Sequence, residues 1–287
     1  MMMELPFVPP AQQILLPSFN LNGVQVFMQR DDMLHPFVSG NKWRKLKYVL
    51  AQAHADGKNH LVSFGGAFSN HLVALACAGA MYQFKTTAFV RGEEVSNHML
   101  NLCKWYGMEL RFVSREAYKN KQLLYQDFAA HQPHTFFIDE GGKGALAAKG
   151  CAEILTDKET FTHTICAVGT GTTLAGLAMA AKQKGMIAEG ICVLKGANQM
   201  DAEIAALAGF DVKVHHDYSC GGYAKTTPEL IQFMKDFAQQ TGILLDQVYT
   251  GKMMFALQQL IQLGYYPAGS KILAIHTGGL LGMMTAL

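Results

Sequence analysis

The sequence lacks the features that mark several large protein classes. Only 16% of its 287 residues are charged and the formal net charge is +2, so there is no basic surplus for binding a nucleic acid or another polyanion. No uncharged apolar run reaches the ~18 residues of a membrane-spanning helix. No basic segment followed by an apolar run stands at the start, so a secretory signal is not expected.

Cysteine pairs and linkers are missing as well. The six cysteines include no C-x-x-C pair and follow no regular spacing, which is typical of reduced, buried thiols in a cytoplasmic protein. His215 and His216 are adjacent without a carboxylate or cysteine at ligand spacing, so no metal site is expected. No repeat, low-complexity tract or Pro/Ser-rich linker divides the chain. Half of the residues are hydrophobic, which indicates a globular protein with a large core.

Short β-rich runs alternate with longer helical patterns along the chain. This alternation predicts an α/β protein with two open, parallel-rich sheets and flanking helices. The expected strands are 24–29, 61–64, 87–90, 109–113, 135–138, 164–168, 190–195, 212–215 and 272–276. The expected helices are 42–55, 70–81, 95–105, 146–155, 172–184, 200–208, 227–241 and 252–263.

A lysine stands in a turn just before a helical pattern, in Ser39-Gly40-Asn41-Lys42-Trp43-Arg44-Lys45-Leu46. A lysine amine reacts with a carbonyl group only when it is neutral, and a defined turn backed by a helix can hold it with a lowered pKa. Taken alone, Lys42 is more simply a solvated surface charge. Its chemistry therefore depends on what else the chain provides.

The loop Gly169-Thr170-Gly171-Thr172-Thr173 follows an expected strand and opens an expected helix. Its glycines allow close approach of a phosphate, and the helix start and threonine hydroxyls supply donors. A Walker A loop is excluded because Leu177 follows Gly176 where lysine is required, and a dinucleotide fingerprint is disfavoured by Leu174. A reactive amine together with a phosphate cradle suggests pyridoxal phosphate as the cofactor.

Ser69, Asn70 and His71 stand at another strand-to-helix junction. They offer a hydroxyl, an amide and main-chain N–H groups to an anion such as a substrate carboxylate. The simpler alternative is that Ser69 or Asn70 only caps the helix. Because ligands gather at the carboxyl ends of parallel strands, this junction, the Gly169 loop and His276-Thr277-Gly278-Gly279 are expected to face one cleft.

Together these motifs resemble the D-cysteine desulfhydrase and 1-aminocyclopropane-1-carboxylate deaminase family. The resemblance rests on motifs that occur in the family's order from about residue 30 onward: 39–46, Ser63-x-Gly65-Gly66-x-x-Ser69-Asn70, 169–176, Gly222-Tyr223, Val248-Tyr249-Thr250-Gly251-Lys252 and 276–279. It implies pyridoxal-phosphate fold type II, which is similar to the tryptophan synthase β chain. It also implies a homodimer that acts on a small amino acid.

The resemblance assigns roles to particular residues. Lys42 would form the Schiff base and act as general base, while the catalytic group would also include Ser69, Tyr223 and Tyr249. Cofactor binding is expected from a larger set: Asn41, Lys42, Asn70, Gly169, Thr170, Gly171, Thr172, Thr173, Thr250 and Thr277, the last two at the pyridine nitrogen. Substrate binding is expected from Ser69, Asn70, His71, Tyr223 and Tyr249.

Two positions depart from the family pattern and bear on the reaction. Threonine stands at 250 where the deaminase branch typically has glutamate, and histidine stands at 71 where glutamine is usual. A neutral partner makes the cofactor ring a weaker electron sink, which favours removal of an α-proton over opening of a cyclopropane. The expected reaction is therefore β-elimination, with D-cysteine giving pyruvate, sulfide and ammonia.

The resulting prediction is a large pyridoxal-phosphate domain from residues 1–45 and 141–287 and a small substrate-side domain from residues 46–140. The alternatives are a 1-aminocyclopropane-1-carboxylate deaminase and a non-catalytic pyridoxal-phosphate-binding protein. A nucleotide-binding ATPase or oxidoreductase is a further rival, disfavoured by the missing phosphate-loop residues. No nucleic-acid or membrane partner is expected, and the choice among amino acids and between D and L forms stays open.

Overall fold

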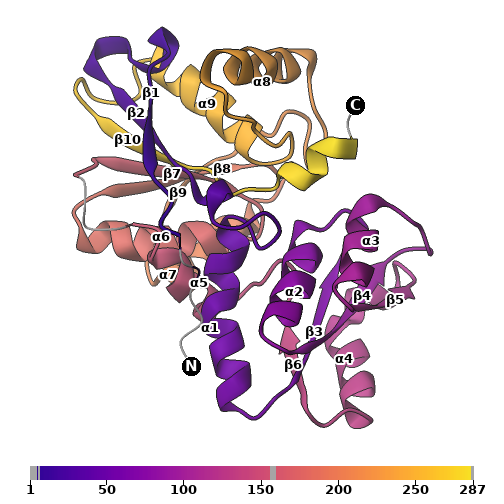
Figure 1. Ribbon diagram of the computed structural model, residues 1–287. Helices are drawn as coiled ribbons and strands as arrows, with labels where there is room; N and C mark the ends of the chain where they lie inside the picture. Colours follow the sequence, from indigo (N-terminus) through magenta and orange to yellow (C-terminus); the bar gives the residue numbers. More distant parts are fainter. Residues whose placement is uncertain (1–4, 6, 156–159, 286–287) are drawn as a thin grey trace.

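The computed structural model describes residues 5, 7–155 and 160–285 and shows two β-sheets, each between layers of helices (Figure 1). The larger sheet has six strands in the order β1-β2-β10-β7-β8-β9 and the smaller has four in the order β5-β4-β3-β6. Within the described part of the chain, β1 and β2 pair antiparallel and the other strand pairs are parallel. The predicted α/β fold with two parallel-rich sheets is confirmed.

The bounds of the elements follow the predicted pattern closely. The strands are β1 Ala11–Ile14, β2 Gln25–Gln29, β3 His60–Gly65, β4 Lys85–Arg91, β5 Glu109–Val113, β6 Thr135–Ile138, β7 His163–Val168, β8 Ile187–Cys192, β9 Lys213–His215 and β10 Lys271–Ile275. The α-helices are α1 Asn41–Ala55, α2 Asn70–Met81, α3 His98–Trp105, α4 Lys121–Ala130, α5 Ala145–Ala152, α6 Thr172–Gln183, α7 Gln199–Ala208, α8 Pro228–Thr241 and α9 Thr250–Gln262. Short 3-10 helices occupy 17–19, 21–23, 31–33, 117–120 and 280–285.

The helices cover both faces of each sheet. In the larger sheet α8 and α9 lie on one face, and α5, α6 and α7 lie on the other (Figure 1). Alternation along β7 explains this, because Ile165 packs in the cluster under α9 while Cys166 packs in the cluster under α6. The smaller sheet has α2 and α3 on one face and α4 on the other (Figure 1).

Some boundaries differ from the prediction for local reasons. The helix expected from residue 95 begins at His98, because the Asn97 side chain accepts a hydrogen bond from the Leu100 N–H and caps it there. The strand expected at 190–195 is β8, which starts earlier because Ile187 already pairs with His163. Strand β1 and helix α4 were not predicted.

Helix α1 connects the two parts of the molecule. Trp43, Leu46 and Leu50 are buried in the hydrophobic cluster of the smaller sheet, and Trp43 stacks on Tyr82 with 5.9 Å between ring centroids. On its other side α1 approaches α5 closely: a Cβ at Gly150 would lie 1.9 Å from the carbonyl oxygen of Arg44. The first turn of α1, which carries Lys42, therefore lies at the junction of both parts.

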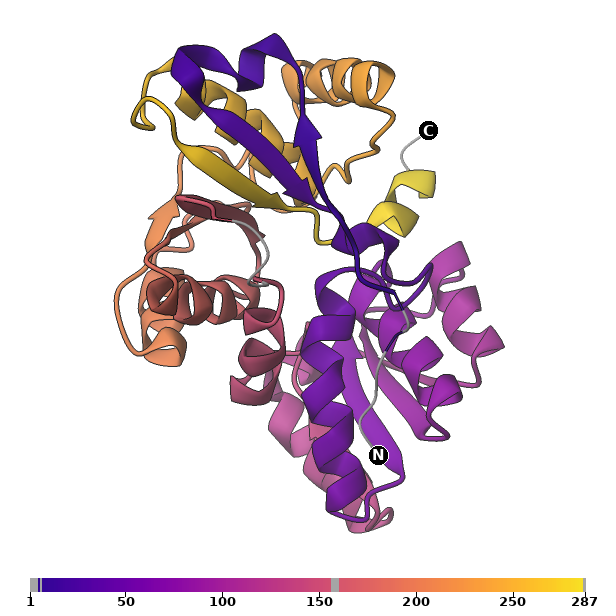
Figure 2. The same cartoon turned by 60° about the vertical axis from the view of Figure 1, so that its left-hand side comes forward.

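The C-terminal 3-10 helix η5, Leu280–Thr285, also connects them (Figure 2). Leu281 packs against the cluster of the smaller sheet and Met283 against that of the larger. The His98 imidazole Nε2 lies 2.9 Å from the Leu281 carbonyl oxygen. This segment closes one side of the space between the sheets.

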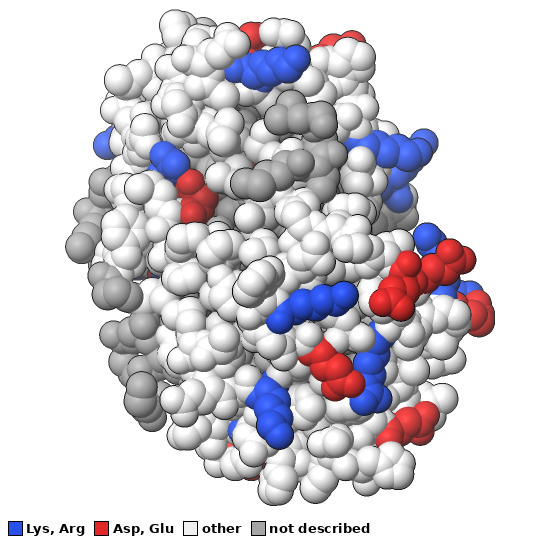
Figure 3. Space-filling model, turned by 45° about the vertical axis from the view of Figure 1, so that its right-hand side comes forward, with Lys and Arg blue, Asp and Glu red and all other residues white. Residues whose placement is uncertain are grey.

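The strands of the larger sheet come from residues 11–29 and 163–275, and those of the smaller sheet from residues 60–138. On the face shown in Figure 3, acidic and basic side chains of the described residues are interspersed. Among the helices of the described residues, none is long and apolar enough to cross a membrane.

Candidate active site

Two loops that are far apart in the sequence fit together beneath α1. Gly40 has a φ of +61°, and a Cβ there would lie 1.9 Å from the carbonyl oxygen of Thr277. A Cβ at Gly278, which has a φ of +78°, would lie 2.2 Å from Ser39 Oγ. Only glycine satisfies both the left-handed backbone and the close approach. The loop after β10 thereby fixes the turn that carries Lys42.

A buried ion pair fixes the same turn from the other side. The Asp31 carboxylate is fully buried and accepts two hydrogen bonds from the Arg44 guanidinium, at 2.9 and 3.1 Å. The Asp31 carbonyl oxygen accepts a hydrogen bond from the Gly40 N–H at 2.9 Å. Since the pairing is bidentate, it sets the direction as well as the position of the first turn of α1.

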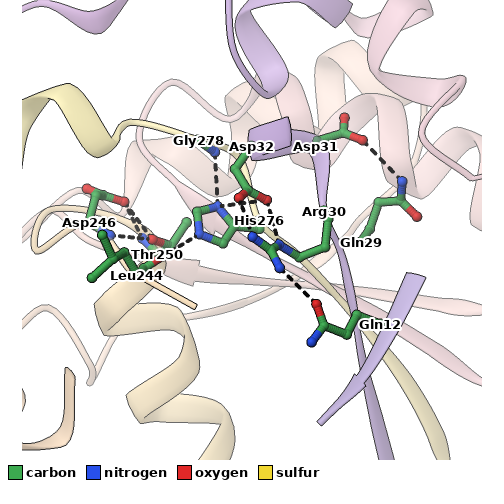
Figure 4. A network of polar contacts seen from close by, with 10 residues as sticks. All are labelled: Gln12, Gln29, Arg30, Asp31, Asp32, Leu244, Asp246, Thr250, His276 and Gly278. Atoms are coloured by element: carbon green, nitrogen blue, oxygen red, sulfur yellow. Dashed lines mark hydrogen bonds and ion pairs between the residues drawn. The ribbon is translucent and has the colours of Figure 1, made fainter. Parts of the chain in front are cut away.

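A buried histidine ties the loop after β10 to the segment before α9 (Figure 4). The His276 Nε2 lies 2.7 Å from the Leu244 carbonyl oxygen and its Nδ1 lies 3.2 Å from the Gly278 N–H, which donates to it. These partners hold the imidazole between the two segments, and its Nδ1 also lies 3.8 Å from Asp32 Oδ1. Nearby, Asp32 pairs with Arg30 at 2.8 Å.

The Lys42 amine lies in a continuous chain of hydrogen bonds that reaches the predicted phosphate loop. Its Nζ donates to Asn41 Oδ1 at 2.7 Å, and Asn41 Nδ2 donates to Thr173 Oγ1 at 2.9 Å. Burial and the charge of Lys45 lower the pKa of Lys42 to about 7. The lysine is thus neutral in a large fraction of molecules near physiological pH, as Schiff-base formation requires.

Lys42 lines a cavity of about 750 Å³, together with Asn70 and Thr277. The cavity continues over α8 and η5, where Met234 and Leu281 line it. Three of the predicted site residues, from α1, α2 and the loop after β10, therefore face one space.

The start of α6 has the properties of an anion site. Its N-cap is Gly171, which provides no side-chain hydrogen bond to the first turn. Thr172 Oγ1 is buried and has no partner among the described residues. A helix N-terminus with uncapped N–H groups and an orphaned hydroxyl fits a phosphate group.

Lys45 of α1 also contacts this loop. Sequence reasoning did not recognise this contact. Its buried ammonium donates to Thr170 Oγ1 at 3.2 Å and to the Gly141 carbonyl oxygen at 2.9 Å. The available signal was spacing, because a residue three positions after Lys42 lies on nearly the same face of α1. A second cation beside the phosphate loop matches the charge of a phosphate.

The two glycines of the loop are required for packing. A Cβ at Gly171, where φ is +75°, would lie 2.5 Å from the side chain of Ile204 on α7. A Cβ at Gly169 would lie 3.0 Å from the ring of Tyr249. A side chain at Gly171 would therefore point to α7, and whether this glycine also leaves room for the phosphate stays a prediction.

Tyr223 and Tyr249 lie together beside this loop, and their place on the substrate side stays a prediction. Their ring centroids are 6.2 Å apart and the rings are nearly perpendicular, at 68°. Burial and the neighbouring Tyr223 raise the pKa of Tyr249 well above its ordinary value. Tyr249 is therefore a protonated phenol that can donate a hydrogen bond, whereas Tyr223 is 53% exposed.

The start of α2 carries the predicted carboxylate-binding residues. Ser69 Oγ caps the helix by accepting from the Leu72 N–H at 3.4 Å. The His71 imidazole is buried, and its Nε2 lies 2.9 Å from the Oγ of Ser63 on β3. Burial and the charges of Lys42 and Lys45 lower the pKa of His71 to about 3, so the imidazole is neutral. The other ring nitrogen, Nδ1, is buried and has no partner among the described residues.

Asp246, which sequence reasoning missed, forms hydrogen bonds with the hydroxyl of Thr250 (Figure 4). The Thr250 hydroxyl donates to Asp246 Oδ1 and accepts from the Asp246 N–H, both at 2.8 Å. The carboxylate also accepts the N–H groups of Val248, Tyr249 and Thr250, so it caps α9. Thr250 is fully buried, whereas Thr277 lines the cavity. A contact of Thr250 with a pyridine nitrogen stays a prediction.

Together, the reactive lysine, the uncapped α6 and the second cation define an enzyme site for a phosphate-bearing aldehyde cofactor. The sequence pattern of the family described as "Pyridoxal-phosphate dependent enzyme" matches residues 8–278. The chain belongs to this family and is a pyridoxal-phosphate-dependent enzyme.

Individual relatives agree with this assignment. The chain is 31% identical to a Pyrococcus horikoshii protein named "Putative 1-aminocyclopropane-1-carboxylate deaminase", over 97% of this chain and 91% of that protein. It is 28% identical to the D-cysteine desulfhydrase of Klebsiella pneumoniae, over 90% of this chain and 87% of the relative. A crystal structure described as an ACC deaminase homologue superimposes with a TM-score of 0.82 at 29% identity, covering 97% of this chain and 91% of the other.

Proposed function

We propose that the protein catalyses β-elimination from a small amino acid, with D-cysteine converted to pyruvate, sulfide and ammonia. One observation carries the proposal: the Lys42 amine, with a pKa of about 7, is connected through Asn41 to Thr173 of the phosphate loop. The reactive amine and the phosphate cradle are thus held at a fixed separation. The likeness to the Klebsiella pneumoniae desulfhydrase supports this choice of reaction.

The phosphate group of the cofactor would bind at the start of α6. The hydroxyl of Thr172, which has no partner among the described residues, the uncapped first turn and the Lys45 ammonium would hold it. Thr170 and Thr173, whose hydroxyls face Lys45 and Asn41, complete the loop. When bound, pyridoxal phosphate supplies an electron sink that makes the α-proton of an amino acid removable.

The remaining groups would handle the substrate and its protons. Ser69 and Asn70 at the start of α2 bind the substrate carboxylate with main-chain N–H groups of the first turn. The Lys42 amine, oriented by Asn41 Oδ1, accepts the α-proton. Tyr249, whose raised pKa keeps its hydroxyl protonated, and the adjacent Tyr223 are the candidates that assist the leaving group by donating a hydrogen bond to it.

A second candidate function is the opening of 1-aminocyclopropane-1-carboxylate. The likeness to the Pyrococcus horikoshii protein and to the ACC deaminase homologue favours it. The residue at 250 is neutral, and its hydroxyl proton is donated to Asp246, which supports the less demanding α-proton chemistry instead.

A substrate panel tests the proposal. The purified protein, loaded with pyridoxal phosphate, is assayed with D-cysteine, L-cysteine, D-serine and 1-aminocyclopropane-1-carboxylate, and pyruvate and 2-oxobutyrate are measured. We expect the highest kcat/KM with D-cysteine and pyruvate as the product. Faster formation of 2-oxobutyrate from the cyclopropane than of pyruvate from any amino acid would establish the second candidate instead.

A lysine variant tests the site within the same assay. Lys42→Ala should lower kcat by about 10³-fold or more, since the base is lost, and should abolish the visible absorbance of the lysine-bound cofactor. Lys104→Ala, on the exposed face of α3, is the matched control and should change neither. Lys45→Ala should weaken cofactor binding but keep the absorbance at saturating cofactor.

We also propose the division into a large domain of residues 1–45 and 141–287 and a small domain of residues 46–140. The separate sheets support it, although α1 packs on both sides of the boundary. The homodimer implied by the resemblance and the cytoplasmic location inferred from the cysteine pattern stay predictions. Gel filtration with light scattering would decide the first of these.

A further inference from the structure

Lys252 is a fully buried lysine outside the set of residues assigned to the reaction. It is the third residue of α9, where the positive end of the helix dipole disfavours a cation. Burial disfavours the charge as well and lowers the pKa of Lys252. An ammonium group at such a position must be stabilised by specific partners.

These partners are two main-chain carbonyl groups of the loop after β9. The Lys252 Nζ donates to the Ser219 carbonyl oxygen at 2.8 Å and to the Gly222 carbonyl oxygen at 2.6 Å. The same carbonyl groups close two successive turns, since Ser219 accepts from the Gly222 N–H and Gly222 accepts from the Lys225 N–H. The ammonium therefore joins both turns at Ser219 and Gly222, the second of which directly precedes Tyr223.

The loop is held in an unfavourable backbone conformation. Cys220 and Ala224 have φ values of +49° and +56°, and the two glycines between them, Gly221 and Gly222, have φ values of +90° and +113°. Left-handed backbone is costly for residues other than glycine. Tyr223 is 53% exposed, so its own burial contributes little to holding the loop in place.

The loop determines where Tyr223 stands over the site. Tyr223 meets the ring of Tyr249, which lies against Gly169 of the phosphate loop. Displacement of the turns at 219 and 222 would move Tyr223 away from this position. Lys252 and Tyr249 belong to one segment, so the segment that provides one tyrosine also anchors the loop that provides the other.

We propose that Lys252 is a positioning residue that holds the loop 219–225 in its strained form and so places the Tyr223 hydroxyl beside the reacting atoms. The part of the proposal that concerns Tyr223 rests on the proposed function; the anchoring of the loop does not. Removal of the ammonium takes the side-chain donor from the Ser219 and Gly222 carbonyl groups and leaves each with a single main-chain N–H, so the two turns are no longer joined. The loop then relaxes while α9, capped by Asp246, keeps its structure.

The first experiment measures amide hydrogen exchange of the full-length protein without substrate. Lys252→Met, which keeps the length of the side chain and removes the donor, should raise exchange in residues 216–225 at least tenfold and leave 252–262 protected. If Lys252→Met does not fold, Lys252→Gln, which keeps an N–H donor, is used and a smaller increase is expected. Unchanged exchange in 216–225 would overturn the proposal whether or not the protein has the proposed activity.

The second experiment is a double-mutant cycle on kcat/KM for β-elimination. Lys252→Met should lower kcat/KM at least tenfold in the parent protein and less than twofold in the Tyr223→Phe background, since the hydroxyl to be placed is then absent. A merely structural role predicts equal losses in both backgrounds, and that result would overturn the placement of Tyr223. Absence of activity in the parent protein would overturn the proposed function, and the exchange measurement would still decide the anchoring.

Discussion

The N-termini of α6 and α9 both reach the candidate site, but they are completed in opposite ways. At α9 the Asp246 carboxylate accepts three main-chain N–H groups and the Thr250 hydroxyl. At α6 the cap is Gly171, without a side-chain hydrogen bond, and the Thr172 hydroxyl has no partner in the described part of the chain. One helix start supplies its own anion, and the other leaves its donors for a ligand.

This difference indicates that one helix start contributes to the stability of the fold and the other to the affinity for a ligand. A capped helix start contributes to folding before any ligand is present. An uncapped start lowers the stability of the free protein, and an anion that binds there stabilises the fold. Substitutions at the two helix starts should therefore separate the two quantities, and the following predictions run from the largest expected effect to the smallest.

Asp246→Ala should show the largest effect on folding. It leaves the donors at the start of α9 without an acceptor, which should lower the free energy of unfolding by about 3 kcal/mol. Urea unfolding of the cofactor-free protein measures this, with Asp56→Ala, an exposed aspartate, as control. A loss below about 1 kcal/mol would show that α9 does not depend on its cap.

Gly171→Ala should also act on folding, although the residue lies in the phosphate loop. The φ of +75° and the 2.5 Å approach to Ile204 both oppose a side chain, so we expect a loss of about 2 kcal/mol. Combining it with Ile204→Val should return part of this loss. If cofactor affinity falls while stability is unchanged, the phosphate and not α7 limits the space at Gly171.

Thr172→Val should lower the affinity for the cofactor without lowering the stability of the cofactor-free protein. Removing a buried hydroxyl without a partner should leave the cofactor-free protein as stable or up to about 1 kcal/mol more stable, while cofactor affinity falls about tenfold. Thr164→Val is the matched control, because that hydroxyl donates to the Leu273 carbonyl oxygen at 3.1 Å. It should destabilise the protein and leave affinity unchanged. Equal affinity in Thr172→Val and the parent would place the phosphate elsewhere.

The smallest effect concerns pH. Because the Lys42 amine must be neutral to react and has a pKa of about 7, the rate of its linkage to pyridoxal should rise with pH around 7 and then level off. In Lys45→Met the charge that lowers this pKa is absent, so the curve should move to higher pH. Pyridoxal, which has no phosphate, avoids confusion with lost phosphate contacts. A curve that moves to lower pH would contradict the assigned influence of Lys45.

Much of the fold could be predicted because periodicity and turn residues are local signals. β2 to β10 each overlap an expected strand. β1, Ala11–Ile14, was missed because it is a short edge strand without apolar alternation, held by its pairing with β2. α4 was missed although its residues favour a helix and Asn120 stands at its N-cap position.

The site was predictable only where a motif combines glycine with a reactive or donor residue. Lys42, Thr172 and Asn70 were singled out in that way. Asp246 and Lys252 were not assigned, because their roles depend on which atoms they contact after folding. Asp246 contacts a residue 4 positions away, and Lys252 contacts residues 33 and 30 positions away. The contact of Gly171 with α7 was missed for the same reason, since the position of α7 is set by tertiary packing.

The position of Trp43 has a practical consequence. The chain has two tryptophans: Trp43 is buried beside Lys42, whereas Trp105 on α3 is 87% exposed. An indole next to the attachment lysine should transfer excitation energy to a bound chromophore, while the other emits into water and is open to collisional quenchers such as iodide. The fluorescence that remains shielded from iodide therefore reports, without any added label, whether the pocket is loaded.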